Sequence, residues 1–206
     1  MERRKFVVGL GSLAAGGAAA TGTGAFSRVS SKRTLSVQAV KDNKAYLGLK
    51  ETESPNESYV DFDDKNHLRI RLDGDNPNLE DGGGIGVNSD STTVFKDLFK
   101  IVNQGKQKIH LFVYKIGPNS GRAALFISDA NTPCWNYTLD VGDSINIGLL
   151  TYTHGLKAKA DGTQLLNQLY ICAVGKENPE DGEYESTAAE MVPDDAEPND
   201  EIPGDE

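Results

Sequence analysis

The chain has 206 residues, a formal net charge of −10 and two cysteines. The acidity belongs to the C-terminal end: residues 176–206 hold 13 acidic residues and one lysine, whereas residues 26–175 hold 17 acidic and 17 basic residues. Phosphate binding needs a basic patch, so a neutral body with an acidic end argues against nucleic acid as a partner.

Residues 1–25 have the layout of a signal peptide for export. The pair Arg3-Arg4 precedes a weakly apolar run, small residues follow, and the pair favours the twin-arginine route over an ordinary secretion signal. We expect the mature chain to begin near Phe26; the alternative is an uncleaved N-terminal anchor, which the glycines of the apolar run disfavour. No other run approaches the roughly 20 apolar residues that span a bilayer, so we expect no membrane span after cleavage.

Strands are predicted along the rest of the body. Residues 34–40 alternate between apolar and polar side chains, which is the period of a half-buried strand, and Val29, Leu35, Val37 and Ala39 form the apolar side of this N-terminal segment. The further predicted strands are residues 45–49, 67–72, 98–102, 109–114, 123–127, 144–152 and 166–174. Residues 103–106 are predicted as a hairpin turn, and residues 92–97 and 162–167 as short helical turns.

So many short strands with turn signals between them predict an all-β fold, an antiparallel β-sandwich over residues 26–175. Residues 176–206 contain four prolines and almost no large apolar side chains. Such a segment buries too little surface to fold, so we predict a disordered acidic tail.

One loop has the residue types of a calcium site. Asp73, Asp75, Asn78 and Glu80 offer oxygen ligands at close spacing, as Ca²⁺ prefers, although Pro77 breaks the helix-loop-helix calcium pattern. The alternative is an acidic turn cluster without a metal. We expect no other cofactor.

The two cysteines and two sequons leave their alternatives open. Cys134 and Cys172 could form one disulfide in an exported protein, or could be two buried thiols, since Cys172 lies in an apolar run. Asn56 and Asn136 each begin an Asn-x-Ser/Thr triplet and are candidate glycosylation sites.

Signatures of catalysis are missing from the sequence. It has no Gly-x-Ser-x-Gly elbow, and His67, His110 and His154 are too scattered for a zinc motif. The glycine-rich residues 82–86 lack the Lys-Ser/Thr and helix of a phosphate loop and are predicted to be a surface loop. We therefore expect a protein that is not an enzyme.

Several short motifs resemble a known group. After the twin-arginine-like signal come Ala-Thr-Gly-Thr-Gly-Ala-Phe-Ser at residues 20–27 and Ala-Tyr-Leu-Gly-Leu at residues 45–49. Later come residues 84–88, 99–105 and Tyr-Thr-His-Gly at residues 152–155. This order resembles small secreted proteins of halophilic archaea related in architecture to the TasA/camelysin group. The resemblance implies a jelly-roll-like β-sandwich at the cell surface, with fibres in which one subunit's N-terminal strand completes the next subunit's sheet.

The leading hypothesis is an exported, non-enzymatic structural protein of the cell surface, a fibre or matrix subunit that self-associates by exchange of its N-terminal strand. The same strand could instead pair within its own domain. The alternatives are a monomeric secreted binding module for cations or surface glycans, and a small secreted hydrolase.

Overall fold

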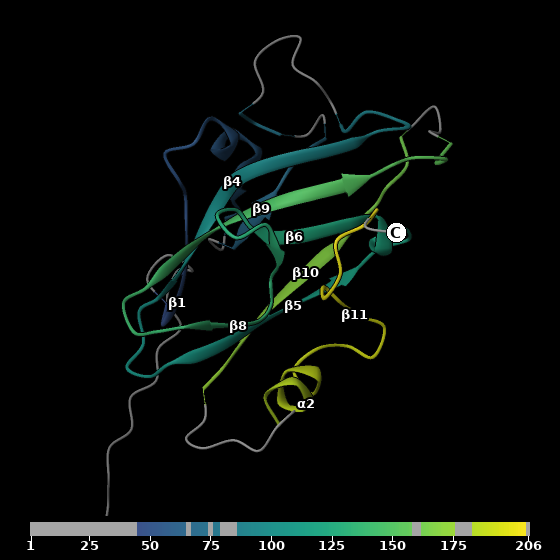
Figure 1. Ribbon diagram of the computed structural model, residues 1–206. Coiled ribbons are helices and arrows are strands. Elements are labelled where there is room, and N and C mark those ends of the chain that lie inside the picture. Colours follow the sequence, from purple (N-terminus) through teal and green to yellow (C-terminus); the bar gives the residue numbers. More distant parts are fainter. Residues whose placement is uncertain are drawn as a thin grey trace, which may run out of the picture. The chain divides into compact units, whose positions relative to one another are not determined.

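The structure is a computed structural model that describes residues 45–64, 67–73, 76–78, 86–157, 162–175 and 183–204. The predicted signal peptide and the apolar residues of the N-terminal segment, Val29, Leu35, Val37 and Ala39, lie outside these ranges. The described part consists of β-strands with one short α-helix and short 3-10 turns (Figure 1).

Two antiparallel sheets form the body. The five-stranded sheet has the order β1 (Leu47–Lys50), β4 (Thr92–Asn103), β9 (Ser144–Tyr152), β6 (Ala123–Ile127) and β7 (Thr132–Pro133). In the four-stranded sheet, β5 (Ile109–Ile116) pairs along one edge with β10 (Gln168–Val174) and along the other with β8 (Trp135–Leu139) and β11 (Glu197–Pro198). A small hairpin, β2 (Val60–Phe62) and β3 (Leu68–Ile70), follows the 3-10 helix η2 (Pro55–Tyr59), and η3 (Ser120–Arg122) precedes β6.

The chain changes sheet after almost every strand. The strands β4, β6 and β9 belong to the five-stranded sheet, and β5, β8 and β10 belong to the four-stranded sheet. This alternation produces a jelly-roll-like arrangement. The predicted all-β antiparallel sandwich is confirmed.

The predicted hairpin turn at residues 103–106 is wrong, because β4 and β5 lie in different sheets. Asn103 is 1% exposed, and its Nδ2 donates to the carbonyl oxygens of Gln107 (2.8 Å) and Leu139 (3.1 Å). Its Oδ1 accepts a hydrogen bond from the backbone N–H of Gly105 (3.0 Å). The buried amide therefore satisfies backbone groups of a loop that crosses between the sheets.

The predicted helical turn at residues 92–97 is also wrong, since these residues form the first half of β4, and residues 162–167 form no helix either. The pairing register of β4 with β9 shifts between Phe95 and Phe99, where Asp97 has a φ of 55°. Such a bulge interrupts the two-residue period of a strand. The consecutive residues Leu98 and Phe99 are both 0% exposed, which regular alternation on a half-buried strand does not produce.

One hydrophobic core lies between the sheets. Ile101, Leu125 and Ile147 enter it from the five-stranded sheet, and Leu111 and Val113 enter it from β5. Each is buried to 0% exposure, and full burial of such a side chain stabilises the fold by about 1.5–3 kcal/mol.

The central strand β5 is buried on both faces. Next to the core residues Leu111 and Val113, Phe112 and Tyr114 lie in a second cluster with Cys172 and other residues. Successive side chains of a strand point to opposite faces, so this second cluster lies on the outer face of the four-stranded sheet. The helix α2 (Glu183–Ala189) packs there, against β5 and β10 (Figure 1).

The prediction of a disordered tail over residues 176–206 is therefore wrong for residues 183–204. Tyr184, Ala188, Val192 and Ala196, each four residues apart, pack in the second cluster, and Ala188 is 0% exposed. Beyond them β11 pairs with β5. Four apolar side chains of this acidic segment serve one contact, which is why low overall hydrophobicity did not prevent folding.

Asn199 fixes the C-terminal segment between the two sheets. It is 0% exposed, and its backbone N–H donates to the carbonyl of Val113 on β5 (2.9 Å). Its side chain bonds the backbone of Leu125 on β6 twice, accepting from the N–H (2.9 Å) and donating to the carbonyl (2.7 Å). The amide of Asn199 thus bonds β6 at Leu125, next to the residues of β6 that pair with β7, and joins that strand to β5.

Replacing Asn199 with alanine should lower the free energy of unfolding by about 1–3 kcal/mol, because the buried backbone N–H of Leu125 loses its acceptor, while the Leu125 carbonyl keeps the Cys134 N–H. Chemical denaturation followed by tryptophan fluorescence measures this change. Asn167→Ala, at an exposed position, is the matched control and should stay within about 0.5 kcal/mol. Equal stability of Asn199→Ala and the control would contradict the role given to Asn199.

Candidate functional site

The two long sides of the sandwich differ. On one side the sheets are joined, since β7 leads through Cys134 into β8 and Asn199 links β6 to β5. On the opposite side the sheets end in β1 and β10, and each of these pairs with a single strand among the described residues. We call these the closed side and the open side.

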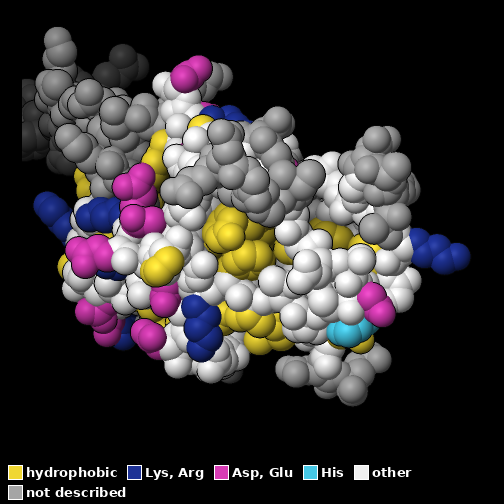
Figure 2. All heavy atoms as spheres, turned by 90° about the horizontal axis from the view of Figure 1, so that it is seen from above, with side chains coloured by type: hydrophobic (Ala, Val, Ile, Leu, Met, Phe, Trp, Pro, Cys, Tyr) yellow, Lys and Arg dark blue, Asp and Glu magenta, His cyan; other side chains and the backbone are white. Residues whose placement is uncertain are grey.

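The open side has an incompletely covered apolar interior. Half-buried hydrophobic side chains of its two strands pack against the main core: Leu47, Leu49, Leu169, Ile171 and Ala173. Leu68 and Ile70 of the β2–β3 hairpin pack on the same core, and Tyr46, just before β1, is 80% exposed. Viewed from the side of β4, hydrophobic side chains are visible at the centre of the molecular surface (Figure 2). An unpaired sheet edge with apolar side chains beside it is the usual place for an added strand.

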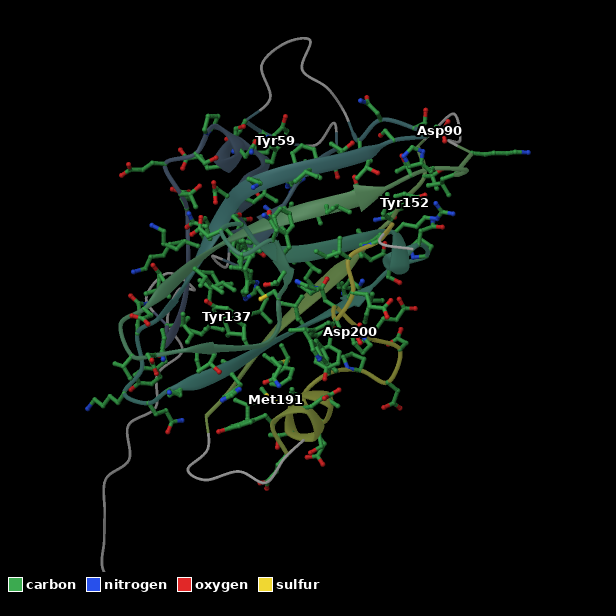
Figure 3. The ribbon with its side chains drawn as sticks, in the orientation of Figure 1. Tyr59, Asp90, Tyr137, Tyr152, Met191 and Asp200 are labelled. Atoms are coloured by element: carbon green, nitrogen blue, oxygen red, sulfur yellow. The ribbon has the colours of Figure 1, made fainter. Side chains whose placement is uncertain are left out.

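The closed side contains a buried lysine. Lys115 is 4% exposed, and its Nζ donates to the carbonyl oxygen of Ala123 (2.9 Å). Burial lowers the pKa of Lys115, and the carboxylates of Glu197, Asp200 and Glu201 act in the opposite direction. The acidic C-terminal segment therefore brings negative charge to a buried cation, with Asp200 close to the end of β11 (Figure 3). The hydroxyl of Ser120 donates to Glu197 as well.

The candidate calcium loop is only partly described. Asp75 and Glu80 lie outside the described residues, and Asp73 is exposed. The side-chain nitrogen of Asn78 donates to the carbonyl of Val60 (3.3 Å), and its backbone N–H donates to Oδ1 of Asn76 (2.9 Å). Among the described residues no group of three or more His, Cys, Asp or Glu side chains could hold a metal ion. Calcium binding by Asp73, Asp75, Asn78 and Glu80 stays a prediction.

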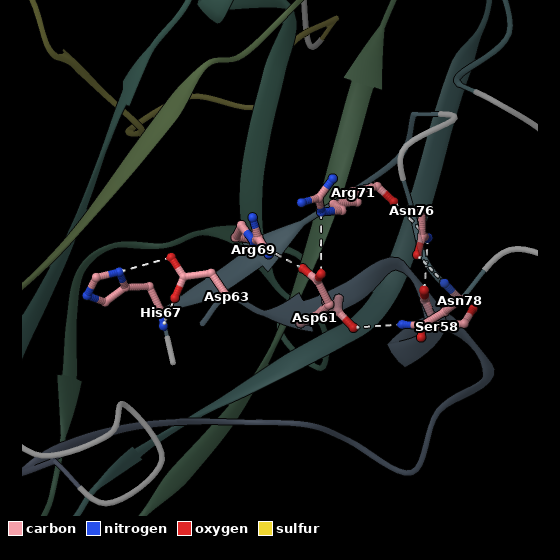
Figure 4. A network of polar contacts seen from close by, with 9 residues as sticks. Ser58, Asp61, Asp63, His67, Arg69, Arg71, Asn76 and Asn78 are labelled. Atoms are coloured by element: carbon pink, nitrogen blue, oxygen red, sulfur yellow. Dashed lines mark hydrogen bonds and ion pairs between the residues drawn. The ribbon is translucent and has the colours of Figure 1, made fainter. Parts of the chain in front are cut away.

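Asparagines of this loop support the β2–β3 hairpin instead (Figure 4). Asn76 is 6% exposed, and its Nδ2 donates to the carbonyls of Ser58 (3.0 Å) and Arg71 (3.1 Å). On the hairpin, Asp61 forms ion pairs with Arg69 and Arg71, each at 3.4 Å. The pattern of closely spaced Asp and Asn residues that suggested a metal loop thus serves, in its described part, as a turn scaffold.

Cys134 and Cys172 are both free and buried. Cys134 lies in the main core and Cys172 in the cluster on the outer face of the four-stranded sheet. A disulfide between them would have to cross that sheet, so the structure favours the alternative of two buried thiols over the bridge.

The two sequon asparagines differ in their surroundings. Asn56 is half-buried in η2, and its Nδ2, the atom that would carry a sugar, donates to the carbonyl of Lys96 (2.8 Å). Asn136 is exposed, and its Oδ1 contacts Nδ1 of His110 (2.9 Å), which leaves Nδ2 outside that contact. Glycosylation at either position stays a prediction, and Asn136 is the more accessible of the two.

The three histidines lie apart in the fold. His67 pairs with Asp63 (3.2 Å), and the ring of His110 stacks on Tyr184 of α2 with 3.8 Å between ring centroids. His154 pairs with Asp90 (3.4 Å) at the end of the sheet where Figure 3 labels Asp90 and Tyr152. The neighbouring Ser91 donates its hydroxyl to the carbonyl of Asn88, so the Ser91, His154 and Asp90 side chains do not form a nucleophile–base–acid chain in this arrangement.

No protein-family model matches the sequence, and no curated protein matches it significantly. Within the described ranges, no helix has the length and apolar character needed to cross a bilayer.

Neither cysteine should react with a thiol reagent in the native protein, because burial raises the pKa of both thiols and closes access to them. After denaturation without reductant, the same reagent should count two thiols per chain. A count of zero in the denatured protein would show a disulfide and contradict the structure.

Cys134 should also make stability fall at alkaline pH. Burial raises the pKa of its thiol from 9.0 to about 12, so between these values the unfolded chain loses the proton and the folded chain keeps it. The contribution of Cys134 to the free energy of unfolding is therefore constant below pH 9 and falls by about 1.4 kcal/mol per pH unit between pH 9 and the raised pKa. Cys134→Val removes the titrating group, so its denaturation free energy should fall less steeply above pH 9 than that of the wild type. Equal alkaline slopes would contradict this assignment.

Proposed function

We propose that the protein is an exported, non-enzymatic structural protein of the cell surface. Its copies assemble into a fibre or matrix when the N-terminal strand of one copy pairs with the open side of the next.

The observation that supports this proposal is the contrast between the two sides of the sandwich. The closed side ends in the short strands β7, β8 and β11, of two, five and two residues, and the chain runs directly from β7 through Cys134 into β8. It therefore offers little continuous edge to an added strand. The open side has strand edges at β1 and β10 and half-buried apolar side chains beside them. An added strand would gain main-chain hydrogen bonds and would cover those side chains.

The N-terminal segment has the sequence of a suitable donor. Residues 34–40 alternate, with Leu35, Val37 and Ala39 on one side, and their length of seven residues equals that of β10. Alternate side chains of an added strand enter pockets while the others face solvent. Pairing of the segment within its own domain uses the same chemistry, and the experiment below separates the two.

The test compares mature protein that begins at Phe26 with a version that begins at Asp42. Light scattering and negative-stain microscopy should show filaments or large oligomers for the first protein. The second lacks the donor strand and should be monomeric, with circular dichroism still showing β-structure.

A matched pair of variants in the longer protein tests the face of the donor. Val37→Asp puts a charge on the apolar side and should abolish assembly, whereas Gln38→Asp puts the same charge on the other side and should leave assembly intact. A monodisperse monomer from the longer protein, unfolded when the strand is removed, would show pairing within one domain and overturn the proposal.

A further inference from the structure

The outer face of the four-stranded sheet contains an open depression of about 480 Å³ beside α2. This volume falls within the range of small-ligand pockets, about 300–1,000 Å³. The lining residues come from β5, β8, α2 and the C-terminal segment: Tyr114, Trp135, Glu185, Ser186, Ala189, Ala196 and Pro198.

Aromatic rings fixed by their neighbours form one wall. Trp135 makes edge-to-face contacts with Tyr114 and Phe112, both with 5.1 Å between ring centroids. These contacts hold the half-buried indole on the sheet rather than leaving it free to turn. The π-face of an indole carries partial negative charge and attracts cations, more strongly than the faces of Tyr or Phe.

The lining also contains a carboxylate. Glu185 is exposed on α2 and lines the depression, and no hydrogen bond or ion pair joins it to another described residue. None of the lining residues is basic. The described residues 183–204 include no Lys, Arg or His and eight acidic residues: Glu183, Glu185, Glu190, Asp194, Asp195, Glu197, Asp200 and Glu201.

We propose that this depression binds an alkylammonium group, with the charge held between the Trp135 ring and the Glu185 carboxylate. The alkyl part would lie on Ala189, Ala196 and Pro198. Charge complementarity selects a cation over an anion, and the aromatic ring favours a weakly hydrated organic cation over a metal ion. A free amine and a lysine side chain of a peptide present the same group to the site. This proposal does not depend on strand exchange, because the depression lies on the outer face of one sheet and not on the open side.

The chain offers a direct readout, because Trp135 is its sole tryptophan. We would titrate full mature protein with choline at constant ionic strength and record Trp135 fluorescence. The uncharged isostere 3,3-dimethyl-1-butanol, which has the same shape, is the control ligand. Choline should give a saturable change and the isostere should give none. n-Butylamine and Nα-acetyl-lysine methylamide, which carry the same primary ammonium group, then distinguish the sources: tighter binding of the lysine amide indicates a peptide lysine, and tighter binding of butylamine indicates a free amine.

Two variants of lining residues and one control variant test the site. Glu185→Gln should weaken choline binding by up to about five-fold, the range of an exposed charge pair. The control is Glu190→Gln, which should leave binding unchanged because Glu190 is exposed just after α2 and does not line the depression. Ala189→Lys should abolish binding by placing an ammonium group in the site. Equal binding of choline and its isostere, equal affinity of Glu185→Gln and Glu190→Gln, or no saturable change with the wild type would each overturn the proposal.

Discussion

The closure of one side of the sandwich by residue Asn199 is the interaction on which the rest of the structure depends. Its backbone bonds Val113 and its amide bonds Leu125, so a single residue ties β5 to β6 across the two sheets. Through this contact the C-terminal segment becomes a third layer that covers the outer face of β5. On the other side the sheets end in β1 and β10, and the outer edge of each has no partner strand among the described residues.

The sequence predicted the strands best where alternation or an apolar run was undisturbed. Residues 123–127 and 144–152 match β6 and β9 fully, and the all-β sandwich follows from such elements. The prediction was wrong in the first half of β4, where the bulge at Asp97 breaks the two-residue period. It was also wrong in the loop after Asn103, because the crossing of this loop between the sheets depends on distant partners such as Leu139. Local pattern does not contain those contacts.

The sequence contains a pattern that predicts the C-terminal layer, although the acidic composition of residues 176–206 argued against it. The continuous apolar runs of β5 and β10 indicate strands buried on both faces, which requires a cover beyond a two-layer sandwich. The four-residue spacing of Tyr184, Ala188, Val192 and Ala196 offers that cover. Net acidity and prolines outweighed this spacing in the prediction. The contact of Asn199 with Leu125, in contrast, could not be found from sequence, since the two residues are 74 positions apart. The same holds for the carboxylates near Lys115, which belong to the distant C-terminal segment.

The most direct test of the central claim, strand exchange at the open side, is hydrogen–deuterium exchange of mature protein at two concentrations. In our account, peptides from β1 and β10 are protected at high concentration and lose protection on dilution, because their partner strand comes from another copy. Peptides from β5 and β9 have neighbours on both edges and stay protected at both concentrations. Protection of β1 and β10 that does not change with dilution would contradict exchange between copies.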